Sequence, residues 1–244
     1  MTDLLYLPDN DYQQRFEATV TDTSNDTTSS DGYIVLDQTL FYKEGGGQPA
    51  DHGEITWDDS GAHVVDVQKS HGDIRHYVDG DLPDEGIVVE GEIDWERRYK
   101  HMRMHTAQHV VSWVALQLFD ASTAGNQIHA DTSRLDLSPI DLDGESIAEI
   151  TSAANNIVEE ARAVTKQSMS RAAVEDRVED GRTNLDLLPE SVDPLRVVII
   201  GDEDLCPCGG THVDNTEEIG MIDVVDHENK GAETERLTFT LSEE

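Results

Sequence analysis

The sequence predicts an α+β fold in two domains, with a small β-barrel over residues 1–94 and a domain of mixed helices and strands over residues 95–244. Three observations lead to this prediction. Short runs rich in β-branched residues, separated by Gly, Asp and Asn, fill the first domain. Residues 94–119 then lack Gly and Pro and have apolar residues at helical spacing. Finally, the apolar run LRVVIIG at 195–201 is typical of a buried strand.

The expected barrel strands are short and follow one another closely. They are the runs GYIVLDQ, GEITW, HVVDVQ, DIRHYV and GIVVEGEIDW. Such spacing between turn residues is typical of a small barrel. Residues 21–32, TDTSNDTTSSDG, are polar throughout, and we expect an exposed loop there.

The second domain begins with the helix expected over 94–119. A second helix is expected over about 145–167, ESIAEITSAANNIVEEARAVTKQ, because apolar residues recur there at helical intervals. The strand at 195–201 then leads directly into a short segment that contains both cysteines of the chain. Helices and strands therefore share this half of the sequence.

The charge of the chain is strongly negative, with 52 acidic against 17 basic residues and a formal net charge of −35. Such a balance ordinarily argues against a nucleic-acid partner, because phosphate binding depends on Lys and Arg. The acids are, however, spread along the whole chain, as in proteins adapted to concentrated salt. In about 1 M salt the Debye length is roughly 3 Å, so that only local contacts matter. The charge therefore indicates a halophilic habitat and does not exclude a nucleic-acid partner.

The two cysteines, Cys206 and Cys208, are separated by one residue, and a disulfide between them would be strained. A disulfide scaffold is therefore excluded, which favours a reducing compartment. The N-terminus lacks a basic region followed by an apolar stretch, and no apolar run reaches 18 residues. We expect a cytoplasmic protein without a membrane anchor; no obligate protein partner is evident, and the oligomeric state stays open.

Two short motifs supply candidate metal ligands. HTAQH places His105 and His109 four residues apart in the expected helix, on one face, although two histidines on a half-buried face would have the same spacing by chance. CGGTH supplies Cys208 and His212 in a glycine-rich loop. Together these make four nitrogen and sulfur ligands, the number that tetrahedral zinc takes. Cys206 falls outside this pattern as a bystander that could substitute as a ligand.

A zinc protease is the first competing interpretation of these histidines. Its HExxH signature requires a glutamate directly after the first histidine. The chain has Thr106 at that position and no glutamate between the two histidines. This leaves either a structural zinc or a different hydrolysis.

Three segments carry a resemblance to a known family. FYKEGGGQPADHG, DWERRYKHMRMHTAQHV and CGGTHVDNTEEIG, in this order, resemble the editing half of alanyl-tRNA synthetase and its free-standing relatives, the AlaX alanyl-tRNA editing proteins. The resemblance covers nearly the whole chain. It implies a barrel that carries the glycine-rich motif, a zinc-containing α+β editing domain, and hydrolysis of the ester in mischarged tRNA(Ala).

The resemblance also assigns residues and a mode of action. The zinc ligands of the family fall on His105, His109, Cys208 and His212. Since 244 residues leave no room for an ATP-binding aminoacylation domain, it implies a trans-acting editor of the medium-length form, without the long C-terminal domain of some relatives.

The expected substrate follows from binding energetics. An aminoacylation pocket that accepts alanine cannot strongly reject serine, which adds one hydroxyl. It also cannot strongly reject glycine, because the missing methyl is worth only about 1–3 kcal/mol of binding energy. A second site that hydrolyses the wrong products is therefore needed. We expect hydrolysis of Ser-tRNA(Ala), with Gly-tRNA(Ala) left open. Gly45, Gly46 and Gly47 would let the aminoacylated end approach the backbone, while Gln48 and Thr106 are the candidate catalytic side chains that offer polar groups.

Two other interpretations of the glycine run remain. It could be a plain turn between barrel strands. The tripeptide GGQ also occurs in peptide-release factors, but three residues are a weak signal, and a zinc group has no place there.

The role of zinc in the reaction is open at this stage. The ion could activate a water molecule or position the substrate. Four protein ligands form the closed shell that is typical of structural zinc, which favours substrate positioning. No general base is evident in the sequence.

The basic residues closest to the metal motif are in the segment ERRYKHMR. Arg97, Arg98, Lys100 and Arg103 are expected to contact phosphates of the tRNA acceptor end, although a solvated helix face with Glu96 as a partial counter-charge explains them equally well. A non-catalytic, zinc-stabilised tRNA-binding module is therefore the alternative function.

Overall fold

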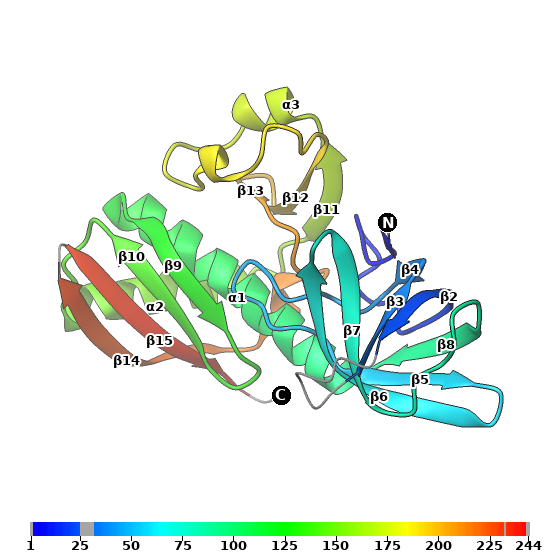
Figure 1. The fold of residues 1–244 in the computed structure, drawn as a ribbon. Helices are drawn as coiled ribbons and strands as arrows, with labels where there is room; N and C mark the ends of the chain where they lie inside the picture. The colour runs from blue at the N-terminus through cyan, green and yellow to red at the C-terminus, as the bar shows by residue number, and fades with distance from the viewer. Residues whose placement is uncertain (1, 25–31, 232, 243–244) are drawn as a thin grey trace. The chain divides into compact units, whose positions relative to one another are not determined.

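The computed structural model describes residues 2–24, 32–231 and 233–242 (Figure 1). The chain divides into two compact units, Met1–Tyr99 and Lys100–Glu244. The described part contains a closed six-stranded barrel and three α-helices, and this confirms the predicted α+β class.

The first unit is the barrel. Its strands close in the order β2-β3-β7-β6-β5-β8, and every neighbouring pair is antiparallel. The bounds are β2 Arg15–Ser24, β3 Gly32–Leu36, β5 Gly53–Trp57, β6 Ser60–Ser70, β7 Asp73–Gly80 and β8 Val88–Ile93. Outside the barrel, β1 (Asp3–Leu4) and β4 (Gln38–Thr39) form a two-residue parallel pair. Closure leaves no unpaired strand edge in the barrel.

Aromatic and aliphatic side chains fill the barrel interior. The ring of Phe16 packs against Gly91 so closely that a Cβ on Gly91 would lie 2.3 Å from a ring carbon. The rings of Phe16 and Phe41 pack edge to face, with their centroids 5.6 Å apart. His76 is also fully buried, with its Nε2 2.9 Å from Thr39 Oγ1. The core of this unit therefore contains one histidine among apolar side chains.

The five strand runs expected from the sequence coincide with β3, β5, β6, β7 and β8. The loop expected over residues 21–32 is wrong at its first four residues, which form the end of β2, while Gly32 begins β3. Residues 25–31 of that expected loop lie outside the described residues. Polar residues are typical of loops, but alternate residues of a barrel strand face outward and can also be polar.

The second unit contains two sheets. The larger has the order β14-β15-β10-β9, and the smaller has the order β11-β12-β13. The bounds are β9 Ser122–Ile128, β10 Ser133–Ser138, β11 Val164–Met169, β12 Leu195–Ile200, β13 Asp204–Pro207, β14 Ile222–Gly231 and β15 Thr234–Leu241. All of these pairs are antiparallel. The strand expected at 195–201 is thus confirmed as β12.

Helix α1 (Trp95–Phe119) matches the helix expected over 94–119. Helix α2 (Gly144–Glu159) has Asp143 as its N-cap. The carboxylate of Asp143 accepts hydrogen bonds from the backbone N–H groups of Glu145 and Ser146. The expectation that this helix continues to residue 167 is wrong. The backbone at Ala161 has a φ of 50°, and the β-branched run that follows forms β11. The remaining short helices are α3 Arg171–Glu175, η1 Leu185–Leu187 and η2 Thr216–Ile219.

Helix α2 packs behind the larger sheet through a paired side-chain contact. The amide of Asn155 donates to Ile222 O at 2.8 Å and accepts from the N–H of the same residue at 2.8 Å. Asn155 therefore joins the helix to the first residues of β14.

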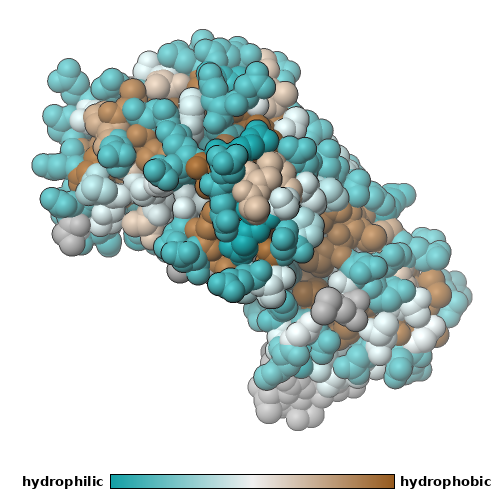
Figure 2. Space-filling view, turned by 90° about the horizontal axis from the view of Figure 1, so that it is seen from above, coloured by the Kyte–Doolittle hydropathy of each residue, from teal (hydrophilic) through white to brown (hydrophobic). Residues whose placement is uncertain are grey.

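The surface is mainly hydrophilic on the face that Figure 2 shows, with smaller groups of hydrophobic residues between. Among the residues that the structure describes, no helix is long and apolar enough to cross a bilayer.

Candidate metal centre

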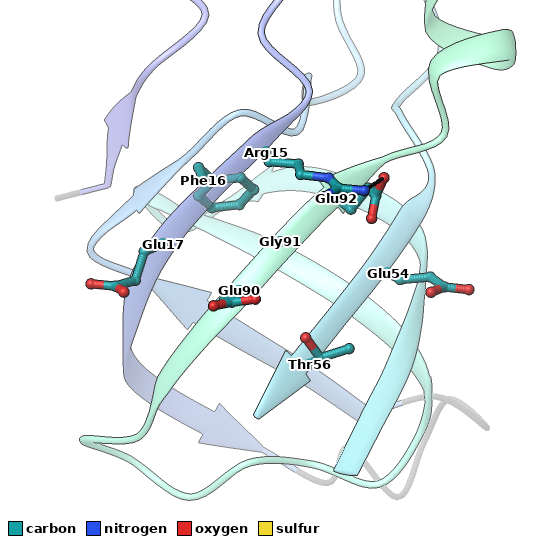
Figure 3. A pocket seen from close by; sticks show the side chains of 8 residues that line it. All are labelled: Arg15, Phe16, Glu17, Glu54, Thr56, Glu90, Gly91 and Glu92. Carbon is teal, nitrogen blue, oxygen red and sulfur yellow. Dashed lines mark hydrogen bonds and ion pairs between the residues drawn. The ribbon is translucent and has the colours of Figure 1, made fainter. Parts of the chain in front are cut away.

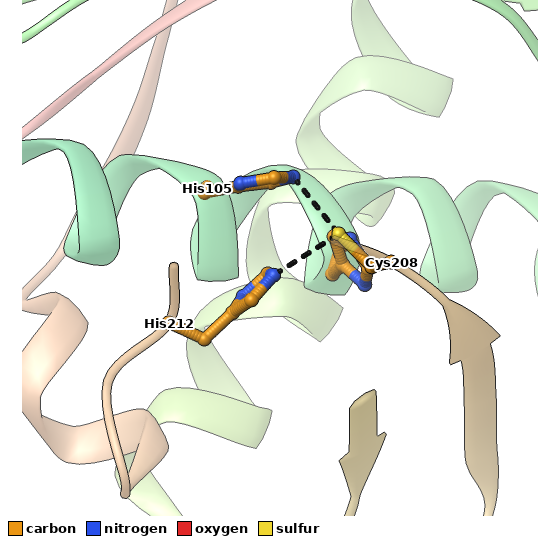
Figure 4. A group of neighbouring side chains, drawn as sticks. His105, Cys208 and His212 are labelled. Atoms are coloured by element: carbon orange, nitrogen blue, oxygen red, sulfur yellow. Dashed lines mark hydrogen bonds between the residues drawn. The ribbon is translucent and has the colours of Figure 1, made fainter. Parts of the chain in front are cut away.

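Four side chains from two distant parts of the second unit meet in one place. Figure 4 labels three of them, His105, Cys208 and His212. His105 and His109 come from consecutive turns of α1, and Cys208 and His212 come from the loop that follows β13. One ligand atom from each of the four lies within 4.8 Å of all the others. The structure thus brings together all four residues that the sequence predicts as metal ligands.

The distances within this group suit a shared ion. Cys208 Sγ lies 3.5 Å from His105 Nε2 and 3.3 Å from His212 Nε2, and these are the two contacts drawn in Figure 4. Around a tetrahedral zinc, with Zn–S of about 2.3 Å and Zn–N of about 2.1 Å, a sulfur and a nitrogen ligand are separated by roughly 3.6 Å. Three imidazoles and one thiolate are also a donor set that zinc prefers. The residues therefore fit a zinc ion.

Burial keeps the imidazoles neutral, as metal binding requires. It lowers the pKa of His105 to about 3, with further contributions from the charges of Arg196 and His101. The pKa values of His109 and His212 are also well below the ordinary histidine value, again chiefly because of burial. Neutral rings retain a lone pair for an ion at all ordinary pH values.

Thr106, the residue between the two helical histidines, fixes the ring of His212. Its hydroxyl donates to Met102 O at 2.8 Å and can therefore only accept from His212 Nδ1, which lies 3.1 Å away. The hydroxyl also accepts from the N–H of Val213 at 3.3 Å. This arrangement places the proton of His212 on Nδ1 and leaves Nε2, the atom that faces Cys208, free for a metal.

The predicted substrate contact of Thr106 does not agree with this environment. The residue is fully buried, and its hydroxyl is engaged by three protein groups. Thr106 therefore positions His212, a candidate metal ligand.

Arg182 supports the other side of the group and was not identified from the sequence. It is buried, with Nε 2.6 Å and Nη2 2.9 Å from the two carboxylate oxygens of Asp204. Its Nη1 donates to Ser112 Oγ at 3.1 Å, and Nη2 lies 3.4 Å from both Nδ1 and the carbonyl oxygen of His109. The sequence signal was weak, because a charged residue in a polar segment ordinarily indicates an exposed loop.

Arg196 holds the loop that carries the other two ligands. Its Nη1 donates to Cys208 O at 2.9 Å and to Gly210 O at 2.7 Å. The only signal for it in the sequence was a single cation in an otherwise apolar strand. Arg196 thus fixes the backbone between Cys208 and His212 and places a positive charge beside the histidines.

Cys206 does not belong to the group. It is buried, its Sγ lies 3.7 Å from Pro207 O, and burial raises the pKa of its thiol to about 12. Both cysteines are free thiols, and Cys206 is a protonated neighbour of the site.

The glycine-rich motif lies in the first unit and forms a tight turn. Gly45 N donates to Gln48 O at 3.1 Å and Gln48 N donates to Gly45 O at 3.0 Å. Gly46 and Gly47, at the centre, have φ values of 60° and 85°, which other residues adopt only with strain. Gln48 is fully buried, so the backbone of the turn is more accessible than this side chain.

The prediction that Arg98 contacts tRNA is wrong. Arg98 is fully buried, with Nε 3.0 Å and 2.9 Å from the two carboxylate oxygens of Asp51. Its other donors reach Asp11 O at 2.9 Å and Leu40 O at 2.7 Å. A helix surface pattern could not show this, because the partner carboxylate lies 47 residues earlier in the chain.

The other three basic residues of this segment are partly exposed. Arg97 donates to Ala50 O through Nε at 3.2 Å and Nη2 at 3.0 Å. Arg103 donates through Nη2 to Ile219 O and Ser242 O, each at 2.8 Å, and among the described residues no carboxylate pairs with it. Contact of Arg97, Lys100 and Arg103 with tRNA stays a prediction.

A groove of about 350 Å³ on the outer wall of the barrel contains none of the predicted site residues (Figure 3). It lies across β2, β8 and β5, and one ion pair, Arg15 Nη2 to Glu92 Oε1 at 2.7 Å, crosses it. Its polar lining residues are Arg15, Glu17, Glu54, Thr56, Glu90 and Glu92. Four carboxylates against one guanidinium make this wall unsuitable for phosphates.

Two family models match the chain. One, described as tRNA synthetases class II (A), matches residues 9–97, and the other, described as threonyl and alanyl tRNA synthetase second additional domain, matches residues 195–238. The second match includes Cys208 and His212.

Curated relatives match nearly the whole chain. The alanyl-tRNA editing protein AlaX-M of Methanosarcina barkeri is 38% identical over 99% of each chain. The alanyl-tRNA editing protein AlaX-L of Pyrococcus horikoshii is 34% identical over 98% of this chain and 58% of its own length. The alanine–tRNA ligase of Halobacterium salinarum is 39% identical over 98% of this chain, but only 26% of the ligase is covered.

Proposed function

The chain belongs to the AlaX family of alanyl-tRNA editing proteins, and from this premise we propose that it hydrolyses the aminoacyl ester of mischarged tRNA(Ala) in trans. The observation that carries the proposal is the group of three buried histidines, His105, His109 and His212, and the half-buried Cys208, whose ligand atoms lie within 4.8 Å of one another. The end-to-end match to free-standing editing proteins, against a quarter of the ligases, supports action in trans.

These four residues would hold zinc, which when bound supplies Lewis acidity beside the ester. The protein residues around them keep the ligands in place. Thr106 fixes the tautomer of His212, and Arg196 fixes the loop between Cys208 and His212. Because one guanidinium holds two carbonyl oxygens of that loop, we expect the thiolate and the imidazole to keep their separation.

The substrate that we propose is Ser-tRNA(Ala), with Gly-tRNA(Ala) as a second candidate. The bare turn at Gly45, Gly46 and Gly47 would admit the aminoacylated 3′ end, because a Cβ at Gly46 would meet no atom within 4 Å. Gln48 would support this turn or contact the serine hydroxyl. A site that pairs with this hydroxyl rejects alanine, since its polar groups would otherwise remain unpaired.

Gln48 can be tested separately from tRNA binding. Gln48→Ala is expected to lower serine-ester hydrolysis more than it lowers tRNA affinity. Equal losses in both would remove the assignment of Gln48 to the reaction.

We place the protein in the cytoplasm of a salt-adapted cell, where its tRNA substrate is found. The distribution of the 52 acidic residues supports this habitat. The habitat can be tested by measuring the deacylation rate of the purified protein at increasing salt concentrations, where we expect the rate to rise.

The deciding experiment is deacylation by the purified chain in high salt. Ser-tRNA(Ala), Gly-tRNA(Ala) and Ala-tRNA(Ala) are supplied separately, and release of each amino acid is followed. The proposal expects serine to be released while alanine is retained, and His105→Ala to abolish release. Tight binding of all three tRNAs without turnover would instead support a zinc-stabilised tRNA-binding module.

A further inference from the structure

Two of the five lysines in this acidic chain, Lys43 and Lys69, lie in neighbouring segments, and within the described ranges neither has a carboxylate partner. Lys43 is half-buried and lies two residues before the glycine turn, and Lys69 is exposed near the end of β6. They are close enough for their charges to repel. Among the described residues, neither ammonium group forms an ion pair or a hydrogen bond. By contrast, Lys166 pairs with Asp214, and Lys230 pairs with Glu228.

The backbone brings both lysines to the glycine turn. A Cβ on Gly45 would lie 3.5 Å from Lys43 Nζ and 3.7 Å from Tyr42 Oη, so the ammonium group lies directly against the turn. The N–H of Glu44 donates to Val67 O at 2.9 Å, which fastens the same segment to β6 two residues before Lys69. Lys43 Nζ therefore lies against the turn, and the segment that carries it is a neighbour of the part of β6 that carries Lys69.

Two neighbouring ammonium groups repel each other and lower the stability of the folded chain unless an anion binds between them. Burial, and then the charge of Lys69, lower the pKa of Lys43. With 52 carboxylates in the chain, a neutralising partner could have been placed here at little cost. Two neighbouring cations without a counter-charge are typical of binding sites for anionic ligands.

We propose that Lys43 and Lys69 form a phosphate-binding site that takes the backbone of single-stranded RNA at the acceptor end of the tRNA. This inference rests on the proposed function, since it assigns to the first unit a share of the same substrate. The side-chain-free Gly46, around which no atom would meet a Cβ within 4 Å, leaves room for the sugar-phosphate chain beside the lysines. The acidic groove on the barrel wall offers no comparable site.

The test compares lysine variants that make the same change of net charge. Lys43→Gln and Lys69→Gln are matched with Lys230→Gln, which removes a lysine from β14, far along the sequence and paired with Glu228. Binding of uncharged tRNA(Ala) is measured over a series of KCl concentrations, together with kcat and KM for Ser-tRNA(Ala). Circular dichroism and thermal unfolding show whether each variant is folded. Lys69→Gln is the variant less prone to unfold, because it replaces an exposed side chain and removes a charge repulsion.

Each of the two site variants should weaken tRNA binding about tenfold at low salt, as loss of a hydrogen bond to a charged group does. The slope of log K against log salt concentration should become shallower by about 0.7 for each lost contact with a single strand. The loss should fall on KM more than on kcat, and Lys→Arg at each position should restore most of the affinity. Lys230→Gln should change none of these quantities.

The site is overturned if Lys43→Gln and Lys69→Gln give the affinity and the salt slope of Lys230→Gln while the wild-type chain deacylates Ser-tRNA(Ala). If the wild-type chain deacylates nothing but the two variants still lose salt slope relative to the control, the proposed function fails and the phosphate site stands. The two failures are thereby distinguishable.

Discussion

Among the residues that the structure describes, each unit buries one arginine–aspartate pair, and the two arginines differ in what else they bind. In the barrel unit, Arg98 binds Asp51, and its remaining donors end on backbone carbonyls. In the second unit, Arg182 binds Asp204, and its remaining donors reach Ser112 and His109. Only the second pair touches a candidate metal ligand.

The two pairs show two reasons for burying a charge: one joins segments of the fold, and the other positions a candidate metal ligand. An ion pair in a protein interior is weak evidence for net stability, because desolvation offsets much of the attraction between the charges. Arg98 joins helix α1 to the segment that closes the glycine turn, since Asp51 also accepts from Tyr42 N at 2.7 Å. Arg182 sets the environment of His109. We therefore expect similar losses of stability from both pairs, but a loss of metal affinity from only one.

The largest expected effect combines stability and metal binding at Arg182. Arg182→Leu leaves Asp204 buried without a partner and should lower the free energy of unfolding by about 3–5 kcal/mol. It should also weaken zinc binding about 10- to 100-fold, as removal of groups that support metal ligands does. Denaturant unfolding and competition with a chromophoric chelator measure the two quantities.

The double variant Arg182→Leu with Asp204→Leu separates these effects. It removes both charges, so stability should largely recover while zinc affinity stays low. Full recovery of zinc affinity in the double variant would show that Arg182 has no role in positioning His109.

Arg98→Leu should lower the free energy of unfolding by a similar amount, about 3–5 kcal/mol, because the buried carboxylate of Asp51 loses its cationic partner. Zinc affinity should stay at the wild-type value. Arg15→Leu, which removes a surface ion pair with Glu92, is the matched control and should hardly change stability. A zinc affinity that falls with Arg98→Leu would contradict the distinction between the two pairs.

His76 gives the barrel unit its own dependence on pH. Burial lowers the pKa of this ring to about 4, against 6.5 for an exposed histidine. Below about pH 6.5 the unfolded chain binds a proton that the folded barrel does not, so stability should fall as pH drops from 6.5 to 4 and then level off. The loss from this group is about 3 kcal/mol.

The histidine can be isolated by difference. His76→Gln, which can keep the hydrogen bond to Thr39, should flatten the pH dependence of the unfolding free energy in zinc-saturated protein. If wild-type and variant curves stay parallel between pH 4 and 7, His76 is not the group that titrates.

Thr106 should give the smallest effect on stability and a selective effect on the metal. Thr106→Val removes the acceptor for His212 Nδ1, and we expect about 1–3 kcal/mol less stability and at least tenfold weaker zinc binding. Thr106→Ser keeps the hydroxyl and should retain most of the affinity. Equal zinc affinities in the two variants would remove this role.

The sequence could predict those features that depend on local pattern. Alternating β-branched runs between turn residues located five barrel strands, and the absence of Gly and Pro over 94–119 located α1. The spacing within HTAQH and CGGTH was sufficient to identify the four clustered residues. Each of these signals lies within a few residues of the feature that it predicts.

The features that were missed depend on contacts between distant segments. Arg98 looked like a surface residue because Asp51 is remote in sequence, and Arg182 and Arg196 reach the site from other segments. Helix α1 buries His101, His105, Thr106, Gln108 and His109, so polarity does not mark its exposed side. The alternation of polar and apolar residues does not predict burial where polar side chains are buried at a functional site. Such positions are concentrated around the four candidate metal ligands.

The most direct test of the central claim is the zinc content of the chain purified under native conditions without added metal. We expect one zinc ion per chain, lost in His212→Ala and in Cys208→Ala and retained in Lys230→Gln. A chain that is folded and contains no zinc, or zinc that persists when both His212 and Cys208 are replaced, would contradict the account.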